Sequence, residues 1–588
     1  MHTDPIRIAN FSGYLGDRFT ALDEVMAGDP VDVLVGDYLA EITMAGVSAG
    51  FTADPKALGD FYAKYFLDQL RPHLGALSER GIKVVVNAGA FNPAGLADAL
   101  RADVDAAGVA LSVAHIEGDD VLSRLDDLRD AGHRFEHLDT GEPLLDSGEQ
   151  PLAANAYLGG WGIAAALEAG ADIVICGRVT DASLVLGPAA WWHCWAWDNW
   201  NALAGAVAAG HVIECGAQAV GGNFSGFTRL PRYRKPGFPI AEIRSDGTSV
   251  ITKRSADEGA VTIDTVTAQL VYEIQGPRYL NPDVTLHIDS IELDDLGSDR
   301  VRIHSVIGSP PPPTTKVSVF TPGGYRIAIN TYLTGIDIDA KFDLLTAQIE
   351  DLTSGSEFEE VAVSRFGSPD VDPADQNAGT ICARIAAAAA TREPLFQLQR
   401  DFNALGLSSI PGFMGGDSSG PKPRIEYWPG LLPQEELRHR VVFANGDSKP
   451  VDAPATTEEF GGQPTHPEPQ AVAIGDTARV PLGRIAYARS GDKGGNSNVG
   501  VWTPDPDIWP FLRALLSTEG LKRLLREVAD TPVVRHEFPH LRAVHFVLPE
   551  LLGRGGSSNL RLDSIGKAVS EYLRARLVDV PIELLERR

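Results

Sequence analysis

The chain has 588 residues and a formal net charge of −28, from 51 Lys and Arg against 79 Asp and Glu. Nucleic acid and anionic lipid repel a polyanion of this kind, so we expect neither nucleic acid nor a membrane as a partner. Hydrophobic residues make up 44% of the chain and charged residues 22%, which is typical of soluble domains with large cores.

Cysteine usage and the N-terminus indicate a cytoplasmic protein. The four cysteines include no CxxC pair, so neither a disulfide framework nor a structural zinc site is expected. No apolar run approaches the roughly 18 residues of a transmembrane helix. The first residues, MHTDP, lack the basic and apolar regions of a secretory signal.

The first 190 residues alternate apolar, strand-like runs with helix-length stretches. The expected strands are 6–10, 31–35, 83–86, 109–113 and 171–176, and the expected helical stretches are 18–28, 55–80, 93–107 and 152–169. Strands separated by helices pair in parallel, because each crossover needs a dozen or more residues. The pattern therefore predicts an α/β fold with a doubly wound, mostly parallel sheet.

A polar or glycine-rich turn follows each of these strands. Ligands of open α/β sheets bind at the carboxyl ends of the strands. We therefore expect one cleft to be lined by Asp37, Asn87, Arg178 and Asp181, together with His211 and Glu214 of the glycine-rich segment that follows. The alternative is that such residues only form turns. In that case Asp37 is a helix N-cap and Arg178 belongs to an internal salt bridge.

An aromatic segment and a glycine-rich segment come next. Residues 191–200 read WWHCWAWDNW and form either a pocket wall or a packing anchor. A glycine-rich loop follows, which carries four polar side chains within 13 residues: His211, Glu214, Cys215 and Asn223. After it, alternation at 240–253 and 260–272 predicts antiparallel strands that extend the sheet.

Composition divides the rest of the chain. We expect an α/β domain over 1–450, with a sub-boundary near 280–340, a Pro-, Thr- and Glu-rich linker over 451–478, and a ferredoxin-like α+β domain over 479–588. Two loops of the last domain, 490–498 and 553–559, each carry one cation and a Gly-Gly pair. Their backbone N–H groups suit an anion, so Lys493 and Arg554 are candidate substrate ligands. A subunit interface is the alternative.

Several runs carry a resemblance to a known family: GDYLAEITMAG (36–46), NAGAFNP (87–93), EGDD (117–120), NAYLGGWGI (155–163), GADIVICGRVTDASL (170–184), GHVIECGAQAVGGNF (210–224) and GFPIAEI (237–243). Over residues 5–450 the chain resembles the acyclic terpene utilisation family. RSGDKGGNSN (489–498) and GRGGSSN (553–559) resemble the small ferredoxin-fold domain that accompanies it. Family members resemble proteins encoded beside acyl-CoA carboxylases and enoyl-CoA hydratases, which implies an acyl-CoA or acyl-carboxylate substrate.

The residues allow acid–base chemistry. No Walker A, helix-opening GxGxxG or GxSxG motif is present, so no cofactor is predicted. The predicted catalytic residues are the carboxylates Asp37, Asp181 and Glu214 together with His211 and Cys215, and the predicted substrate ligands are Asn87, Asn155, Arg178, Asn223, Lys493 and Arg554. A divalent ion held by Asp37, Glu41, Asp119, Asp120 and Asp181 is an alternative, although no metal is predicted.

Two classes of function remain open. The first is a cofactor-independent lyase or hydratase acting on an acyl-CoA or related acid, in a homo-oligomer. The second is a non-catalytic assembly partner of an acyl-CoA carboxylase. Convergent polar turns favour the enzyme, because an assembly partner needs no polar crevice.

Overall fold

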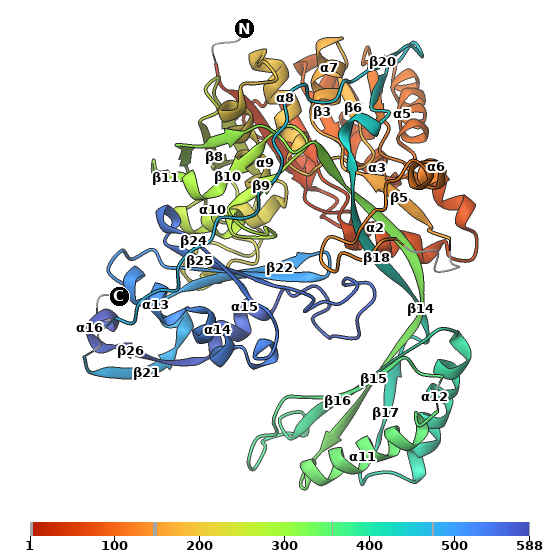
Figure 1. The fold of residues 1–588 in the computed structure, drawn as a ribbon, viewed down its shortest axis with the longest axis vertical. Coiled ribbons are helices and arrows are strands. Elements are labelled where there is room, and N and C mark those ends of the chain that lie inside the picture. The colour runs from red at the N-terminus through yellow and green to blue at the C-terminus, as the bar shows by residue number, and fades with distance from the viewer. Residues whose placement is uncertain (1–3, 145–149, 356, 473–474, 587–588) are drawn as a thin grey trace.

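A computed structural model describes residues 4–144, 150–355, 357–472 and 475–586. Its main body is built on an 11-stranded sheet with the order β11-β12-β8-β7-β1-β2-β3-β6-β4-β19-β20. The five strands at its centre are all parallel: β1 (Ile6–Ser12), β2 (Val33–Gly36), β3 (Lys83–Val86), β6 (Ile173–Ile175) and β4 (Val113–Glu117). The predicted parallel core is therefore confirmed (Figure 1).

Antiparallel strands extend this core on both sides. One side carries β7 (Pro239–Ile243), β8 (Ser249–Lys253), β12 (Val301–His304) and β11 (Glu292–Asp295), and the other carries β19 (Arg440–Val442) and β20 (Ser448–Pro450). The extension expected after the glycine-rich segment is present, although residues 263–270 form a helix, α10 (Ile263–Leu270), in place of the second expected strand.

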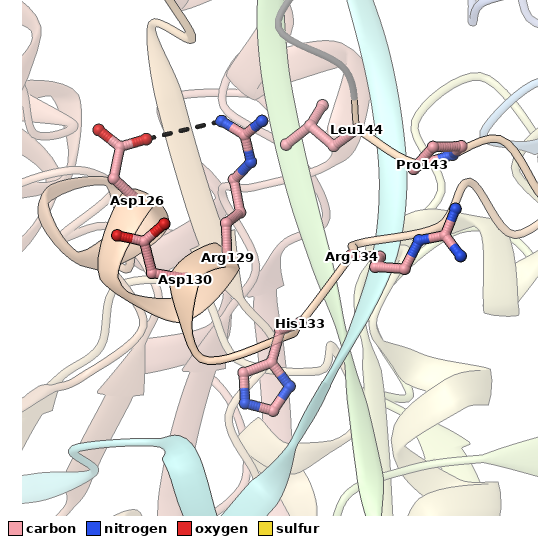
Figure 2. Close-up of a pocket in the computed structure, with 7 residues that line it drawn as sticks. All are labelled: Asp126, Arg129, Asp130, His133, Arg134, Pro143 and Leu144. Atoms are coloured by element: carbon pink, nitrogen blue, oxygen red, sulfur yellow. Dashed lines mark ion pairs between the residues drawn. The ribbon is translucent and has the colours of Figure 1, made fainter.

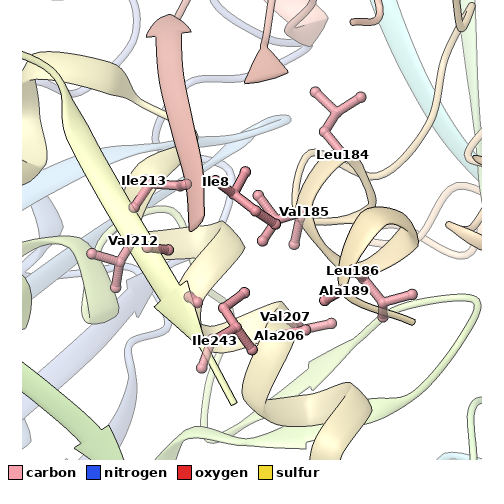
Figure 3. Close-up of a cluster of buried hydrophobic side chains, with 14 of the residues drawn as sticks. Ile8, Leu184, Val185, Leu186, Ala189, Ala206, Val207, Val212, Ile213 and Ile243 are labelled. Carbon is pink, nitrogen blue, oxygen red and sulfur yellow. The ribbon is translucent and has the colours of Figure 1, made fainter. Parts of the chain in front are cut away.

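Helices cover both faces of the sheet. One face carries α1 (Ala21–Met26), α3 (Lys64–Leu70), α4 (Leu74–Arg80) and α5 (Pro93–Ala107), and the other carries α7 (Trp161–Glu168), α8 (Ser183–His193) and α9 (Trp200–Ile213). Alternation along β1 explains the two cores, because Ile6 and Ile8 pack with the second set and Ala9 and Phe11 with the first. Figure 3 shows Ile8 among side chains of α8, α9 and β7.

Two sequence expectations fail locally. Residues 109–112 precede the fourth strand, which begins at Val113. The stretch 152–169 is only partly helical, because β5 (Ala153–Ala156) precedes α7 and pairs with the distant strand β14. Its small side chains are buried between two layers, so no polar alternation marks it as a strand.

A long strand leads from the main body into a separate lobe. β14 (Thr314–Thr334) pairs with β5 and β18 (Lys422–Pro433) at one end and with β16 (Thr380–Ala389) and β17 (Met414–Ser418) at the other. β15 (Glu360–Phe366) completes the lobe sheet, and α11 (Ile338–Leu352) and α12 (Arg392–Ala404) cover one of its faces. Figure 1 shows this lobe projecting from the main body.

The C-terminal domain has its own core. An antiparallel sheet with the order β22-β23-β25-β24 is made of β22 (Tyr487–Lys493), β23 (Asn496–Trp502), β25 (Ala543–Leu548) and β24 (Val534–Phe538). Its helices are α13 (Trp509–Leu515), α14 (Thr518–Leu524), α15 (Val569–Ala575) and α16 (Ile582–Leu585), and β21 (Thr477–Pro481) pairs with β26 (Leu577–Pro581). The predicted α+β domain is confirmed.

Shorter elements complete the fold. They are α2 (Glu41–Gly50), α6 (Leu125–Asp130), β9 (Arg278–Leu280), β10 (Thr285–His287) and β13 (Ile307–Ser309). Residues 451–472, within the predicted linker, contain no helix or strand. Within the described ranges no helix is both long and apolar enough to cross a membrane.

Candidate active site

The strand-end residues meet at the carboxyl edge of the parallel core. Asp37 follows β2, Asn87 follows β3, and Arg178 follows β6. The Asn87 side-chain amide donates a hydrogen bond of 2.7 Å to Asp37 Oδ1, and its oxygen accepts the Tyr38 N–H at 2.6 Å. The topology therefore brings together side chains that the sequence separates by 50 residues.

Arg178 is held inside the protein rather than presented to solvent. Its guanidinium donates to Asp181 Oδ1 at 2.8 Å and to the Leu39 carbonyl at 2.9 Å, and it stacks on the Tyr157 ring. The side chain is 1% exposed. Its main contact is thus the internal ion pair with Asp181, and only its Nε lacks a hydrogen-bond partner among the described atoms.

His211, Glu214 and Cys215 come from the end of a helix. His211 belongs to the last turn of α9, so the expectation of a loop at this residue is wrong. A three-residue spacing on a helix places two side chains on one face, and His211 Nδ1 lies 3.2 Å from Glu214 Oε1. Glu214 therefore contacts His211.

Burial and mutual repulsion change the protonation of this site. Burial, followed by the charge of Asp181, raises the pKa of Asp37 well above its ordinary value, and the same two causes raise the pKa of Glu214. Burial, followed by the charge of Lys493, lowers the pKa of His211 to about 4. Burial also raises the pKa of the Cys215 thiol. The His211 imidazole is thus neutral near pH 7, and burial favours the protonated forms of Asp37, Glu214 and Cys215.

A second group of charged residues completes the site. The sequence indicated Glu41 only as an alternative ligand for a divalent ion, and it did not indicate Lys316. Glu41, at the start of α2, accepts hydrogen bonds from Tyr157 at 2.6 Å and from Lys316 of β14 at 2.7 Å. Burial favours a higher pKa for Glu41, but the charges of Lys316, Lys493 and Arg178 outweigh it and hold the pKa well below its usual range. No local motif marks Lys316, because it lies in an ordinary alternating strand.

The C-terminal domain supplies further charges. Lys493 lies at the tip of the β22–β23 hairpin, where Gly494 adopts a φ of +67°, and its ammonium lies 5.8 Å from the Tyr279 ring centroid. Beside it, Lys567 contacts Glu273 and lies 3.2 Å from Asp492. Burial raises the pKa of Asp492 to about 6. We refer to the full set as the charged cluster: Asp37, Glu41, Arg178, Asp181, His211, Glu214, Glu273, Lys316, Asp492, Lys493 and Lys567.

Three predicted substrate ligands lie outside the charged cluster. Asn155 donates to the buried carboxylate of Asp119 at 2.9 Å and so supports the turn before Arg178. Asn223 is exposed, and its carbonyl accepts a hydrogen bond from Arg489. Arg554 pairs with Glu142 at 3.3 Å and stacks on Trp428.

The two glycine-rich loops of the C-terminal domain lie side by side. The Leu552 N–H donates to the Gly495 carbonyl, and together the loops line a narrow opening beside Glu41 and Tyr427 with a volume of about 10 Å³. In the second loop the N–H groups of Gly553 and Gly555 donate to the chain just before them. Those two groups therefore do not form the predicted anion nest.

Two larger hollows share no residue with the charged cluster. Figure 2 shows one beside α6, of about 600 Å³, where Asp126 pairs with Arg129. The tryptophan-rich segment lines the other, of about 530 Å³, where Trp161 stacks on Trp197. For metal binding, no group of three His, Cys, Asp or Glu side chains in the described residues has suitable geometry.

An α/β body with a buried acid–base cluster, completed by a ferredoxin-like domain, defines the class of the protein. Comparison with protein families agrees with it. The model of the acyclic terpene utilisation family protein AtuA matches residues 6–443, and that of the AtuA ferredoxin-like domain matches residues 480–579. The chain belongs to this family, which is implicated in acyclic terpene utilisation. A search of curated proteins gave no match, and neither did a search of solved structures.

Proposed function

We propose that the protein is a lyase or hydratase that acts on an acyl-CoA or a related acyl-carboxylate by carboxylate acid–base chemistry. One observation carries the proposal: Asp37 is a buried acid with a raised pKa, beside the Arg178–Asp181 ion pair. Environments that separate the pKa values of neighbouring carboxyl groups are how enzymes obtain an acid and a base at one pH. The family's role in terpene utilisation supports a substrate of the acyl type.

The residues supply each part of a dehydration. Asp181 removes the proton next to the thioester carbonyl, and the electron pair moves to the carbonyl oxygen as an enolate. Lys316 and Lys493 stabilise this negative charge. The enolate then re-forms the carbonyl and a C=C bond while the 3-hydroxyl leaves as water with the proton of Asp37. Transfer of the proton from Asp181 to Asp37 restores the site, and hydration is the reverse.

Exchange of the α-proton tests the proposal without knowledge of the reaction direction. The protein is incubated in D₂O with a panel of branched 2-enoyl- and 3-hydroxyacyl-CoA thioesters, and mass spectrometry follows deuterium uptake and water addition or loss. Asp37→Asn keeps the side-chain size and is expected to lower turnover at least 100-fold, as loss of a general acid does. Asp120→Asn is the matched control, because Asp120 follows β4 but is exposed.

A folded wild-type protein with neither exchange nor turnover for any thioester would refute the proposal. Stable co-purification of a carboxylase in that case would favour the non-catalytic assembly role.

A further inference from the structure

Three cations share one face of the lobe sheet. Arg326 of β14 lies directly opposite Lys422 of β18, and Arg384 of β16 lies opposite Asn330, four residues along β14. Side chains two residues apart on a strand point to the same side. Arg326, Arg384 and Lys422 therefore project from the same face.

This face is turned away from the helices of the lobe. The intervening residues Ile327, Ile329 and Ile385 pack in the core with α11 and α12. The cationic face instead has a floor of small residues, where Leu560 of the C-terminal domain packs against Ala386 and Ala388. It thus lies at the junction between the lobe and the C-terminal domain.

The two arginines converge on one short segment. Arg326 donates to the Asn559 carbonyl at 2.6 Å, and Arg384 donates to the Leu560 carbonyl at 2.7 Å. Each guanidinium carries five N–H groups, so most of its donors are not used by these contacts.

No carboxylate neutralises these cations. Among the described residues, Arg326, Arg384 and Lys422 form no ion pair, while the neighbouring Arg424 pairs with Glu359 at 2.9 Å. Burial, and then the charges of Arg424 and Arg384, lower the pKa of Arg326. Like charges directly opposite each other destabilise a sheet. In a chain of net charge −28, this group of cations forms a local positive surface that is suited to an anion.

We propose that Arg326, Arg384 and Lys422 bind the phosphate groups of the substrate, in the manner of the diphosphate of a coenzyme A ester. Planar guanidinium groups suit phosphate oxygens. The proposal extends the proposed function and takes the nature of the substrate from it.

The loop at 553–561 connects this cationic face with the charged cluster. Gly555, Gly556 and Ser557 line the narrow opening beside Glu41, and Asn559 and Leu560 lie on the cations. In the proposed complex the thioester lies at the charged cluster and the phosphates lie on the far part of the same loop. Coenzyme A esters have this arrangement, because the long pantetheine arm separates the reactive thioester from the phosphate groups.

Calorimetric titration with coenzyme A, which carries no acyl group to react, tests the site independently of turnover. The variant is Arg384→Gln combined with Lys422→Gln, because glutamine removes each charge and at position 384 still offers an N–H to the Leu560 carbonyl. We expect affinity for coenzyme A to fall about tenfold or more, and inorganic diphosphate to compete for the wild-type site.

Arg365→Gln is the matched control, since Arg365 lies opposite Ala383 on the other face of the same sheet and pairs with Asp339. Unchanged coenzyme A affinity in a double variant with wild-type thermal unfolding would overturn the proposal. An S-acyl pantetheine, which lacks phosphate, separates the two proposals. Its turnover depends on Asp37 and not on Arg384, whereas charge-dependent binding of coenzyme A without any turnover would refute only the enzymatic function.

Discussion

Replacing Glu214 with glutamine should stabilise the folded protein relative to the wild type. This difference in the free energy of unfolding should grow as the pH rises. The Glu214 side chain is 6% exposed, Oε1 lies 3.2 Å from His211 Nδ1, and Oε2 lacks a hydrogen-bond partner among the described atoms. Burial and the charge of Asp181 raise its pKa well above that of the unfolded chain. Glutamine has the same shape and never ionises, and its side-chain amide can donate to or accept from His211 Nδ1.

The sign follows from proton linkage. Because the folded pKa of Glu214 is raised, its contribution to stability is fully present below the unfolded pKa, about 4.3. It is lost as the pH rises through the folded pKa. Between these two values the folded state binds about one more proton than the unfolded state, which costs the wild type about 1.4 kcal/mol per pH unit. The stability difference in favour of Glu214→Gln should therefore grow by that amount per unit.

Urea unfolding at a series of pH values from 5 to 8 measures this difference. Most of the tryptophans lie between residues 161 and 200, so their fluorescence reports on the domain that contains Glu214. Glu24→Gln is the control: the contacts of Glu24 with Lys235, Thr20 and Arg18 outweigh its burial and lower its pKa, so it titrates below this pH range. Its substitution should lower stability by an amount that does not change from pH 5 to 8. A difference for Glu214→Gln that does not change with pH would refute the reasoning.

Three further predictions concern the ion pair, the domain contact and acid stability. Arg178→Met should destabilise the protein by about 3–5 kcal/mol, because it leaves Asp181 without its buried partner; adding Asp181→Asn should recover part of the loss in thermal unfolding. Gly495→Ala should loosen the packing of the C-terminal domain, because a Cβ there would lie 2.2 Å from the Gly553 carbonyl oxygen. Limited proteolysis should then cleave this variant faster than the wild type. Gly461→Ala is the control, because its Cβ meets nothing within 4 Å and the cleavage rate should not change. Burial, and then the charge of His466, lower the pKa of His536 to about 4. The contribution of neutral His536 to folding stability is therefore present above pH 6.5 and is lost as the pH falls toward 4. His536→Gln should reduce the loss of stability in acid, and an unchanged acid unfolding curve would contradict this.

Local patterns were enough to predict much of the architecture. The apolar runs of β1, β2, β3 and β6 are bounded by turns and separated by helices, and this order favours a parallel core. The strand-end rule then placed Asp37, Asn87 and Arg178 together, because parallel strands end at one edge. Failures fell where burial removed the pattern, as in β5, whose four small residues are enclosed on both sides.

The sequence by itself determined the fold class, the family and the strand-end half of the candidate site, since each depends on periodicity or on residues close along the chain. Only the tertiary structure decided the other half, because Glu41 meets Lys316 across 275 residues and Lys493 arrives on a hairpin of another domain. The tertiary structure also decided the protonation of the site's titratable groups. A raised pKa such as that of Asp37 arises from burial and from the field of neighbouring charges, and both exist only after distant elements have packed together.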